Sequence, residues 1–193
     1  MKYILPFLAL ILVGCATTPP RSTANVCSIF AEKPDWYEAA LSAQKTWGVP
    51  VSVQMAIINQ ESSFVEDARP PRDWFLFIPL SRPSSAYGYS QALDGTWARY
   101  QQSTGHDGAD RDDFDDAVDF IGWYVNRSRQ ELGIARGDAY RQYLAYHEGQ
   151  GGYRQGTHRT KPALLNAARK VASNSGRYER QLSGCRAELD ENL

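Results

Sequence analysis

Apolar residues recur at helical spacing along most of the chain. The clearest stripe consists of Phe114, Ala117, Val118, Ile121 and Val125. This pattern predicts an amphipathic helix, which Asp112 or Asp113 can cap at its start and Gly133 can end. The acidic residues over 107–119 fit the solvated start of such a helix, where the helix dipole favours negative charge, better than a calcium loop.

Similar spacing and end signals predict the other helices. One is capped by Asp35, runs to Trp47 and stops at Gly48. Further helices are expected over 93–102, 138–146, 162–172 and 178–189. No alternating pattern of apolar and polar residues is long enough to predict a β-strand. The chain is therefore expected to form an all-α, or mainly α, domain.

The stretch 50–64 carries the strongest candidate for chemistry. Pro50 suits the first turn of a helix, because its missing N–H has no partner there. One face of this helix consists of Val53, Ala56, Ile57 and Gln60. Packing of that face carries Glu61 towards the interior, where burial raises the pKa of a carboxyl group and lets it act as an acid near neutral pH. The alternative is that Glu61 ends the helix in solvent.

Three segments in order strengthen the first interpretation. They are Glu61-Ser62-Ser63-Phe64, then 86–93 followed by Thr96-Trp97, and then 145–151 with the sequence Ala-Tyr-His-Glu-Gly-Gln-Gly. Their order and spacing resemble the lytic transglycosylases of the soluble-lytic-transglycosylase type, over roughly residues 34–182. The resemblance implies a lysozyme-like helical domain, similar to goose-type lysozyme, with an added loop rich in Pro, Arg and aromatic residues.

The resemblance also implies an activity and a set of site residues. Glu61 is expected to cleave the β-1,4 bond between N-acetylmuramic acid and N-acetylglucosamine in peptidoglycan, with formation of 1,6-anhydro products and without a cofactor. The expected substrate-binding residues are Ser62, Tyr87, Gly88, Ser90, Gln91, Tyr146, His147, Glu148, Gly149 and Tyr178. Gly88 allows close approach of backbone to the groove, and the Gln91 amide can bond an N-acetyl or hydroxyl group. Packing is the expected role of Leu93 and Trp97, and an alternative one for Tyr178.

The third segment departs from the family pattern at two positions. His147 stands where Asn is common, and Glu148 where a small residue is usual. The His-Glu pair does not continue into a zinc motif, because Gly151 occupies the position of the second histidine, so no metal is expected. Glu148 keeps a hydrolytic muramidase open, since hydrolysis commonly uses a second carboxylate. A non-catalytic, peptidoglycan-binding envelope lipoprotein is the other alternative.

The N-terminal segment reads as an export signal. Lys2 precedes an apolar run of about ten residues, which is too short to span a bilayer. The run ends in Leu12-Val13-Gly14-Cys15, which resembles the bacterial lipoprotein box, so Cys15 is expected to carry lipid after removal of residues 1–14. Ala16 favours the outer membrane, facing the periplasm. An ordinary signal peptide cleaved slightly later is the alternative.

The remaining chain is expected to divide into a polar tether over 15–26 and one domain over 27–193. Cys27 and Cys185 lie near the ends of that domain. In an oxidising compartment an even pair most simply forms a disulfide, with two free thiols as the alternative. Closing so long a loop contributes about 4–5 kcal/mol on the chain-entropy model.

Charge and composition limit the partners. A formal net charge of −1 argues against nucleic acid, which requires a basic patch. Peptidoglycan strands, the membrane and an envelope or secretion assembly remain as partners.

The loop 65–85 is long for a connection in a compact domain. It holds Pro70, Pro71, Pro79, Pro83, Arg69, Arg72, Arg82, Trp74, Phe75 and Phe77. It can form a wall of the glycan groove, with aromatic faces on sugars and arginines on peptide carboxylates, or it can serve as core packing, a membrane contact or a partner contact.

Overall fold

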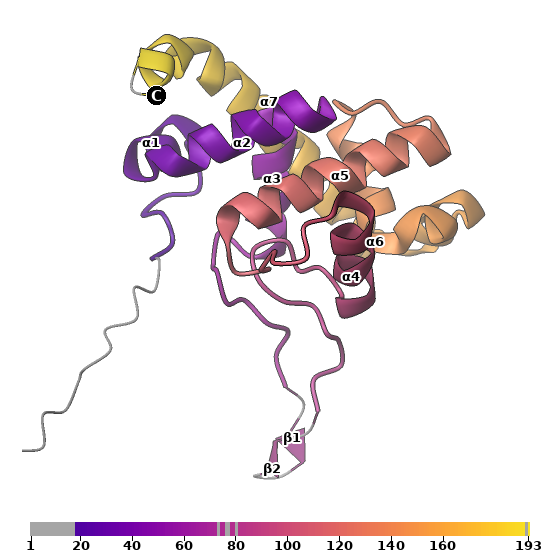
Figure 1. Cartoon of the computed structure of the whole chain (residues 1–193). Coiled ribbons are helices and arrows are strands. Elements are labelled where there is room, and N and C mark those ends of the chain that lie inside the picture. The colour runs from indigo at the N-terminus through magenta and orange to yellow at the C-terminus, as the bar shows by residue number, and fades with distance from the viewer. Residues whose placement is uncertain (1–17, 73, 76–77, 80, 192) are drawn as a thin grey trace, which may run out of the picture.

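A computed structural model describes residues 18–72, 74–75, 78–79, 81–191 and 193, and they form a mainly helical domain (Figure 1). The helices are α1 (Val26–Glu32), α2 (Pro34–Trp47), α3 (Val51–Glu61), α4 (Asp94–Thr104), α5 (Phe114–Leu132), α6 (Ala139–Gln155) and α7 (Pro162–Glu191). A 3-10 turn, η1 (Thr157–Thr160), connects α6 to α7. The all-α prediction is confirmed.

The predicted export signal and Cys15 lie outside the described residues. Within the described part of the chain, no helix is long and apolar enough to cross a membrane. The first helix, α1, was missed in the sequence because it has only seven residues; Asn25 caps it by accepting bonds from two backbone N–H groups.

Helix α3 is the central element of the fold. It packs against α2, α5 and α7 (Figure 1), and every residue from Val51 to Ile58 is buried. The predicted inward packing of Val53, Ala56 and Ile57 is confirmed, and burial extends beyond that face to the polar side chains of Ser52 and Gln54. Pro50 occupies the N-cap position. Glu61, the last residue of α3, thus follows a buried stretch of helix and lies where the helix becomes partly exposed.

The predicted helix ends are partly right. Asp113 caps α5 by accepting bonds from two backbone N–H groups, and Gly133 ends it in the left-handed conformation, as predicted. The N-cap position of α2 is Lys33, so the prediction that Asp35 caps this helix is wrong. Asp35 lies in the first turn of α2 instead, where its negative charge interacts favourably with the helix dipole.

Helix α7 runs unbroken through the predicted gap between 172 and 178. Asn174, Ser175 and Gly176 disfavour a helix, but Asn174 and Ser175 are buried within α7. Packing of α7 against α3 and α6 supplies the stabilisation that local propensity lacks. The prediction of two separate helices is wrong for that reason.

The two ends of the domain are joined covalently. Cys27 in α1 and Cys185 in α7 form a disulfide with their Cα atoms 6.2 Å apart. Figure 1 shows α1 beside the C-terminal end of α7. The predicted clamp is confirmed, and it closes a loop with a sequence separation of 158 residues.

The segment between α3 and α4 projects from the helical body as a long hairpin (Figure 1). Its far end carries β1 (Trp74–Phe75) paired antiparallel with β2 (Ile78–Pro79). Strands of two residues are too short to leave a periodic pattern, so the sequence did not predict them. Phe77 lies outside the described residues, and the stacking role of the loop aromatics stays a prediction.

The candidate active site

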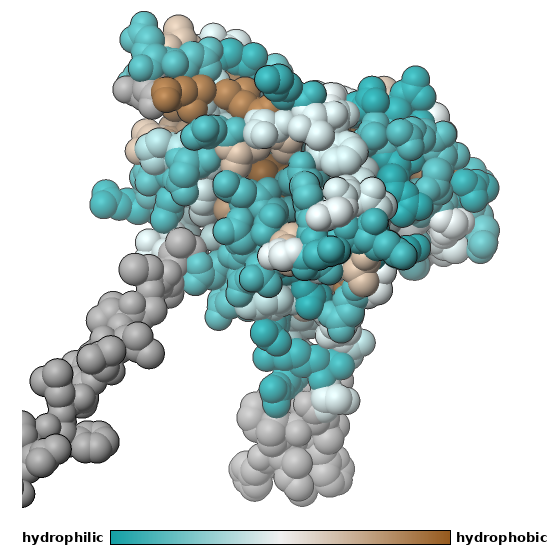
Figure 2. Space-filling model, viewed as in Figure 1, coloured by the Kyte–Doolittle hydropathy of each residue, from teal (hydrophilic) through white to brown (hydrophobic). Residues whose placement is uncertain are grey.

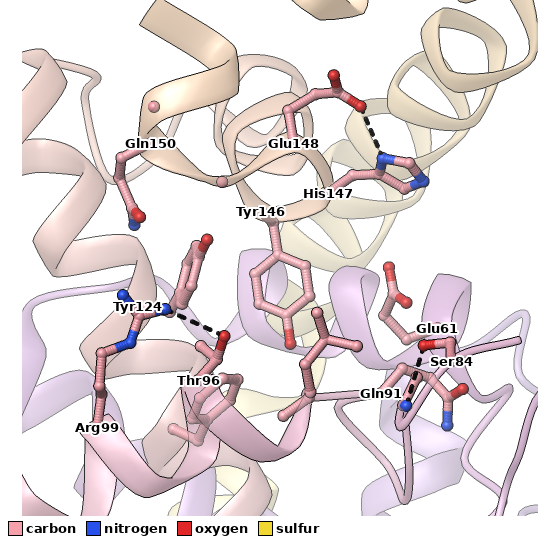
Figure 3. Close-up of a pocket in the computed structure, with 16 residues that line it drawn as sticks. Glu61, Ser84, Gln91, Thr96, Arg99, Tyr124, Tyr146, His147, Glu148 and Gln150 are labelled. Atoms are coloured by element: carbon pink, nitrogen blue, oxygen red, sulfur yellow. Dashed lines mark hydrogen bonds and ion pairs between the residues drawn. The ribbon is translucent and has the colours of Figure 1, made fainter.

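A cavity of about 540 Å³ opens where the C-terminal end of α3 meets α4, α5 and α6 (Figure 3). Of the predicted site residues, it is lined by Glu61, Gln91, Tyr146, His147, Glu148 and Gly149. Figure 3 shows the Glu61 carboxyl group beside Tyr146 and facing the space below the α6 backbone. The structure therefore assembles parts of all three sequence segments around one carboxyl group.

The chain turns sharply directly after Glu61. Ser62 Oγ accepts a bond from the Phe64 N–H at 3.2 Å, and Ser63 and Phe64 have φ values of 53° and 65°. Left-handed conformations cost energy for non-glycine residues and are concentrated at functional sites. Ser62 thus supports the turn after Glu61 and is not among the described residues that line the cavity, and its substrate-binding role stays a prediction.

The carboxyl group of Glu61 is tuned for proton transfer. Burial raises its pKa from 4.5 to about 7, and a hydrogen bond with the Tyr143 hydroxyl lowers it only in part. Oε1 is buried, and no residue of the described chain hydrogen-bonds to it. The carboxyl group is therefore about half protonated near pH 7, and its Oε1 atom is available to hydrogen-bond a ligand.

Tyrosines surround this carboxyl group. Tyr143 is buried, and its pKa is raised by burial and by the charge of Glu61. The Tyr146 hydroxyl donates to the Ser90 carbonyl at 2.6 Å, and the Tyr146 ring lies edge-on to that of Tyr124, 5.0 Å away between centres. Burial also raises the pKa of Tyr146 and Tyr124, so their hydroxyls stay neutral.

Tyr143 was missed in the sequence although a signal was present. It stands three residues before Tyr146, so both occupy one face of α6. Helix α4 has the same kind of signal. Leu93, Thr96 and Arg99 follow at intervals of three and all line the cavity. The prediction that Leu93 is packed is wrong, since 48% of it is exposed.

Trp97, in contrast, is a packing residue as predicted. It is buried, its ring lies 5.1 Å from that of Phe120 between centres, and its indole N–H donates to the Ala109 carbonyl at 3.2 Å. It anchors the inner face of α4, and the cavity face is left to the residues on the opposite side.

Gly149 kinks α6 at the wall of the cavity. Its φ of 72° and ψ of 159° fall in a region that is essentially restricted to glycine. Helix α6 was predicted to end at Tyr146, and it continues to Gln155 only across this kink. The predicted role of Gly149 at the site is thus a conformational one.

Glu148 is held in an ionic network at the edge of the cavity. The Lys161 Nζ lies 2.8 Å and 2.9 Å from its two oxygens, Thr157 Oγ1 donates to Oε2, and His147 Nδ1 lies 3.1 Å from Oε1. Burial would raise the pKa of Glu148, but the bonds from Lys161, Thr157 and His147 lower it to about 2. Figure 3 shows the Glu148 carboxylate in contact with the His147 ring. Glu148 is a permanently ionised, structural group.

The second sequence segment both lines the cavity and supports its wall: the lining includes Ala86, Gln91, Ala92, Leu93 and Thr96. A Cβ on Gly88 would lie 1.9 Å from the Arg111 carbonyl oxygen. Gly88 was predicted to allow close approach of backbone to the groove, but the close approach is to the Arg111 backbone. Ser90 is fully buried behind the wall. The Gln91 amide nitrogen donates to the Ala68 and Gly88 carbonyls at 2.8 Å each, so this donor is used within the protein.

Two predicted tyrosines lie elsewhere. Tyr87 lines a neighbouring cavity, and its hydroxyl donates to Asp112 at 2.7 Å. The Tyr178 hydroxyl donates to the Thr23 carbonyl and accepts from Asn59 Nδ2 at 2.8 Å. Tyr178 is not among the described residues that line the cavity around Glu61. Its contacts favour the packing alternative, because they tie the segment before α1 to α3.

Several acidic residues over 107–119 accept hydrogen bonds within the protein. Asp113 caps α5, and Asp116 accepts from the Asp110 N–H at 2.8 Å. Asp119 accepts from the Trp47 indole at 2.6 Å and from the Tyr100 hydroxyl at 2.8 Å. Over the described residues, no cluster of three or more His, Cys, Asp and Glu side chains has metal-binding geometry.

Comparison with known proteins agrees with this geometry. A family model described as a transglycosylase SLT domain matches residues 3–185. A search of curated proteins gives no significant match. The match spans Glu61, the cavity, and both cysteines of the disulfide.

Proposed function

Because the chain belongs to the family of transglycosylase SLT domains, whose activity is cleavage of peptidoglycan, we propose that it is a lytic transglycosylase forming 1,6-anhydro-muramyl products. The bond cleaved is the β-1,4 linkage between N-acetylmuramic acid and N-acetylglucosamine. The observation that carries the proposal is Glu61: a carboxyl group with a pKa of about 7 and a buried oxygen to which no described residue hydrogen-bonds, set in the wall of a cavity of about 540 Å³.

One carboxyl group performs both proton transfers. Protonated Glu61 donates its proton to the glycosidic oxygen as the bond between that oxygen and the muramyl C1 breaks. Glu61 is then ionised and takes the proton of the muramyl C6 hydroxyl, whose oxygen bonds to C1 and closes the anhydro ring. The enzyme returns to its protonated state, and no water is consumed.

The neighbouring groups support a single-carboxylate reaction. Hydrolysis commonly requires a second carboxylate to activate water or attack the sugar. Glu148 is a poor base because its pKa is about 2, and Lys161 occupies both of its oxygens. The raised pKa values of Tyr143 and Tyr146 keep their hydroxyls neutral near pH 7, so neither tyrosine replaces Glu61 as the base.

The test is digestion of purified sacculi followed by mass spectrometry of the released muropeptides. Anhydro products from the native protein and none from Glu61→Gln are expected. Glu61→Gln keeps the shape of the side chain and removes proton transfer, so a loss of at least about 10²- to 10⁴-fold is expected. Reducing-end products would establish a muramidase instead, and binding without any product would establish a non-catalytic wall-binding protein.

We also propose that the protein is anchored through lipid on Cys15 and faces the periplasm, in the outer membrane. The sequence Leu12-Val13-Gly14-Cys15 supports this proposal, as does a polar segment between Cys15 and the start of α1 at Val26. Cys15→Ser should release the protein into the soluble fraction. Retention on membranes in high salt would contradict a lipid anchor at this residue.

A further inference from the structure

A second cavity of about 310 Å³ adjoins the catalytic one and shares Ser84 and Ala86 with it. Three arginines line it, two from the projecting hairpin and one from the segment before α5: Arg69, Arg82 and Arg111. Tyr87 and Asp94 also contribute to its walls. The chain thus gathers cationic groups beside the site of cleavage.

The arginines are organised around one aromatic ring. The Arg69 guanidinium carbon lies 4.0 Å from the centre of the Tyr87 ring, and that of Arg111 lies 5.4 Å from it. Asp112 accepts a bond from the Tyr87 hydroxyl and so fixes the ring. The Arg82 side chain donates to the Pro70 carbonyl across the base of the hairpin. Stacking on a fixed ring holds a guanidinium in place with its N–H groups still able to donate.

The charge of this cavity is only partly neutralised. Arg111 pairs with Asp94 at 2.8 Å and donates to the Ser85 and Ala92 carbonyls, so it has a structural role. Arg69 and Arg82 form no ion pair with any carboxylate that the structure describes. Figure 2 shows that the base of the hairpin presents a hydrophilic surface. Two cations beside a catalytic groove form a receptor for an anionic group of the substrate.

From this arrangement we infer that the second cavity binds a carboxylate of the stem peptide that the glycan strand carries, an inference that rests on the proposed function. Every peptide-bearing muramyl residue holds its stem next to the sugar backbone, so a strand in the catalytic cavity brings carboxylates to the adjoining one. Arg69 and Arg82 contact the carboxylate, and Arg111 positions Tyr87 and the cavity wall. The projecting hairpin is thereby a specificity element for peptide-bearing strands.

The test is equilibrium binding of Glu61→Gln full-length protein, which prevents cleavage, to soluble glycan oligomers in three forms. The oligomers carry free stem peptides, carry the same peptides with amidated carboxylates, or carry no peptides. Arg69→Gln and Arg82→Gln should each weaken binding of the first form by about three- to tenfold, with the effect shrinking at high salt. Arg72→Gln is the matched control, since Arg72 lies in the same hairpin, is exposed and is outside the described lining of the cavity.

The inference requires that the two variants bind the peptide-free and amidated oligomers as the parent does. Equal weakening for all three forms, no weakening for the peptide-bearing form, or no binding by the parent overturns it. Turnover of sacculi by the protein with an intact Glu61 is measured in parallel. If anhydro products form but the arginine variants bind all three oligomers as the parent does, the inference about the second cavity is wrong and the proposed activity stands. If the arginine variants weaken binding of the peptide-bearing oligomer but no products form, the proposed activity is wrong and the inference about binding stands.

Discussion

The Tyr143 hydroxyl hydrogen-bonds the Glu61 carboxyl group, and burial of that group outweighs the bond, so that its pKa stands at about 7. A general acid must be protonated when substrate binds. We therefore expect kcat/KM to be high below pH 7 and to fall tenfold per pH unit well above it. A profile of kcat/KM against pH on a soluble glycan substrate measures this fall, the basic limb of the profile. A flat profile between pH 6 and 9 would contradict the assignment of Glu61 as the general acid.

Tyr143→Phe should shift that limb to higher pH. The hydrogen bond from Tyr143 lowers the pKa of Glu61 by stabilising the carboxylate, so its removal raises the pKa above 7. A shift of up to about one pH unit is expected. Tyr153→Phe, with a tyrosine in the same helix outside the described lining of the catalytic cavity, serves as the control and should leave the profile in place.

Glu61→Gln should stabilise the fold in a pH-dependent manner. Below pH 4.5 the carboxyl group is protonated in both states, so wild type and variant differ little. As the pH rises from 4.5 to 7, ionisation stabilises only the unfolded state, and the penalty is complete above pH 7. The free energy of unfolding should therefore be higher in the variant by up to about 3 kcal/mol at pH 8. Urea titrations at pH 4 and pH 8 measure the difference, and equal stability at pH 8 would argue against a buried, ionised Glu61.

Glu148→Gln should lower stability without changing the products. The lowered pKa of Glu148 means that its bonds stabilise the fold above pH 4.5 and that this contribution is lost as the pH falls through about 2. A loss of about 2 kcal/mol at pH 7 is expected. Lys161→Met should cost a similar amount, and the double variant less than the sum, because both changes break one network. Anhydro products absent from Glu148→Gln but present in Glu61→Gln would exchange the roles of the two carboxylates.

Reduction of the disulfide between Cys27 and Cys185 should lower the melting temperature markedly. The chain-entropy model gives about 4–5 kcal/mol for so long a loop, which corresponds to about 10–15 °C in a domain of this size. Calorimetry with and without reductant measures the shift. Cys27→Ser should match the reduced protein and be insensitive to reductant. Labelling of both thiols in the oxidised protein would contradict the bond.

The helices were predictable where one local signal acts alone. Asp113 and Gly133 bound α5 as expected because a cap and a left-handed glycine depend on the chain within one turn. The prediction of a helix break near Asn174 was wrong because it considered only the low helix propensity of that residue, while the contacts that keep α7 continuous come from α3 and α6. Helix existence was therefore easier to predict than helix continuity.

At the site, chemistry was easier to predict than placement. Burial of Glu61 followed from its position at the end of an apolar segment. Gly88 was expected to face the groove, but its partner is the Arg111 backbone, which lies more than twenty residues away in sequence and depends on the tertiary fold. Glu148 looked like a candidate base because the sequence does not show that Lys161 and Thr157 meet it in space.

The bond between Cys27 and Cys185 also closes the chain between these two residues into a covalent ring. Helices α2–α6, most of α1 and most of α7 lie within this ring, which also includes the projecting hairpin, a surface segment open to proteolysis. A single cut in that hairpin opens the ring but leaves one covalent molecule, because the two fragments remain joined through the disulfide. Helices α1–α3, with Glu61, and α4–α7, with the rest of the cavity, would then persist as a nicked pair that separates only on reduction.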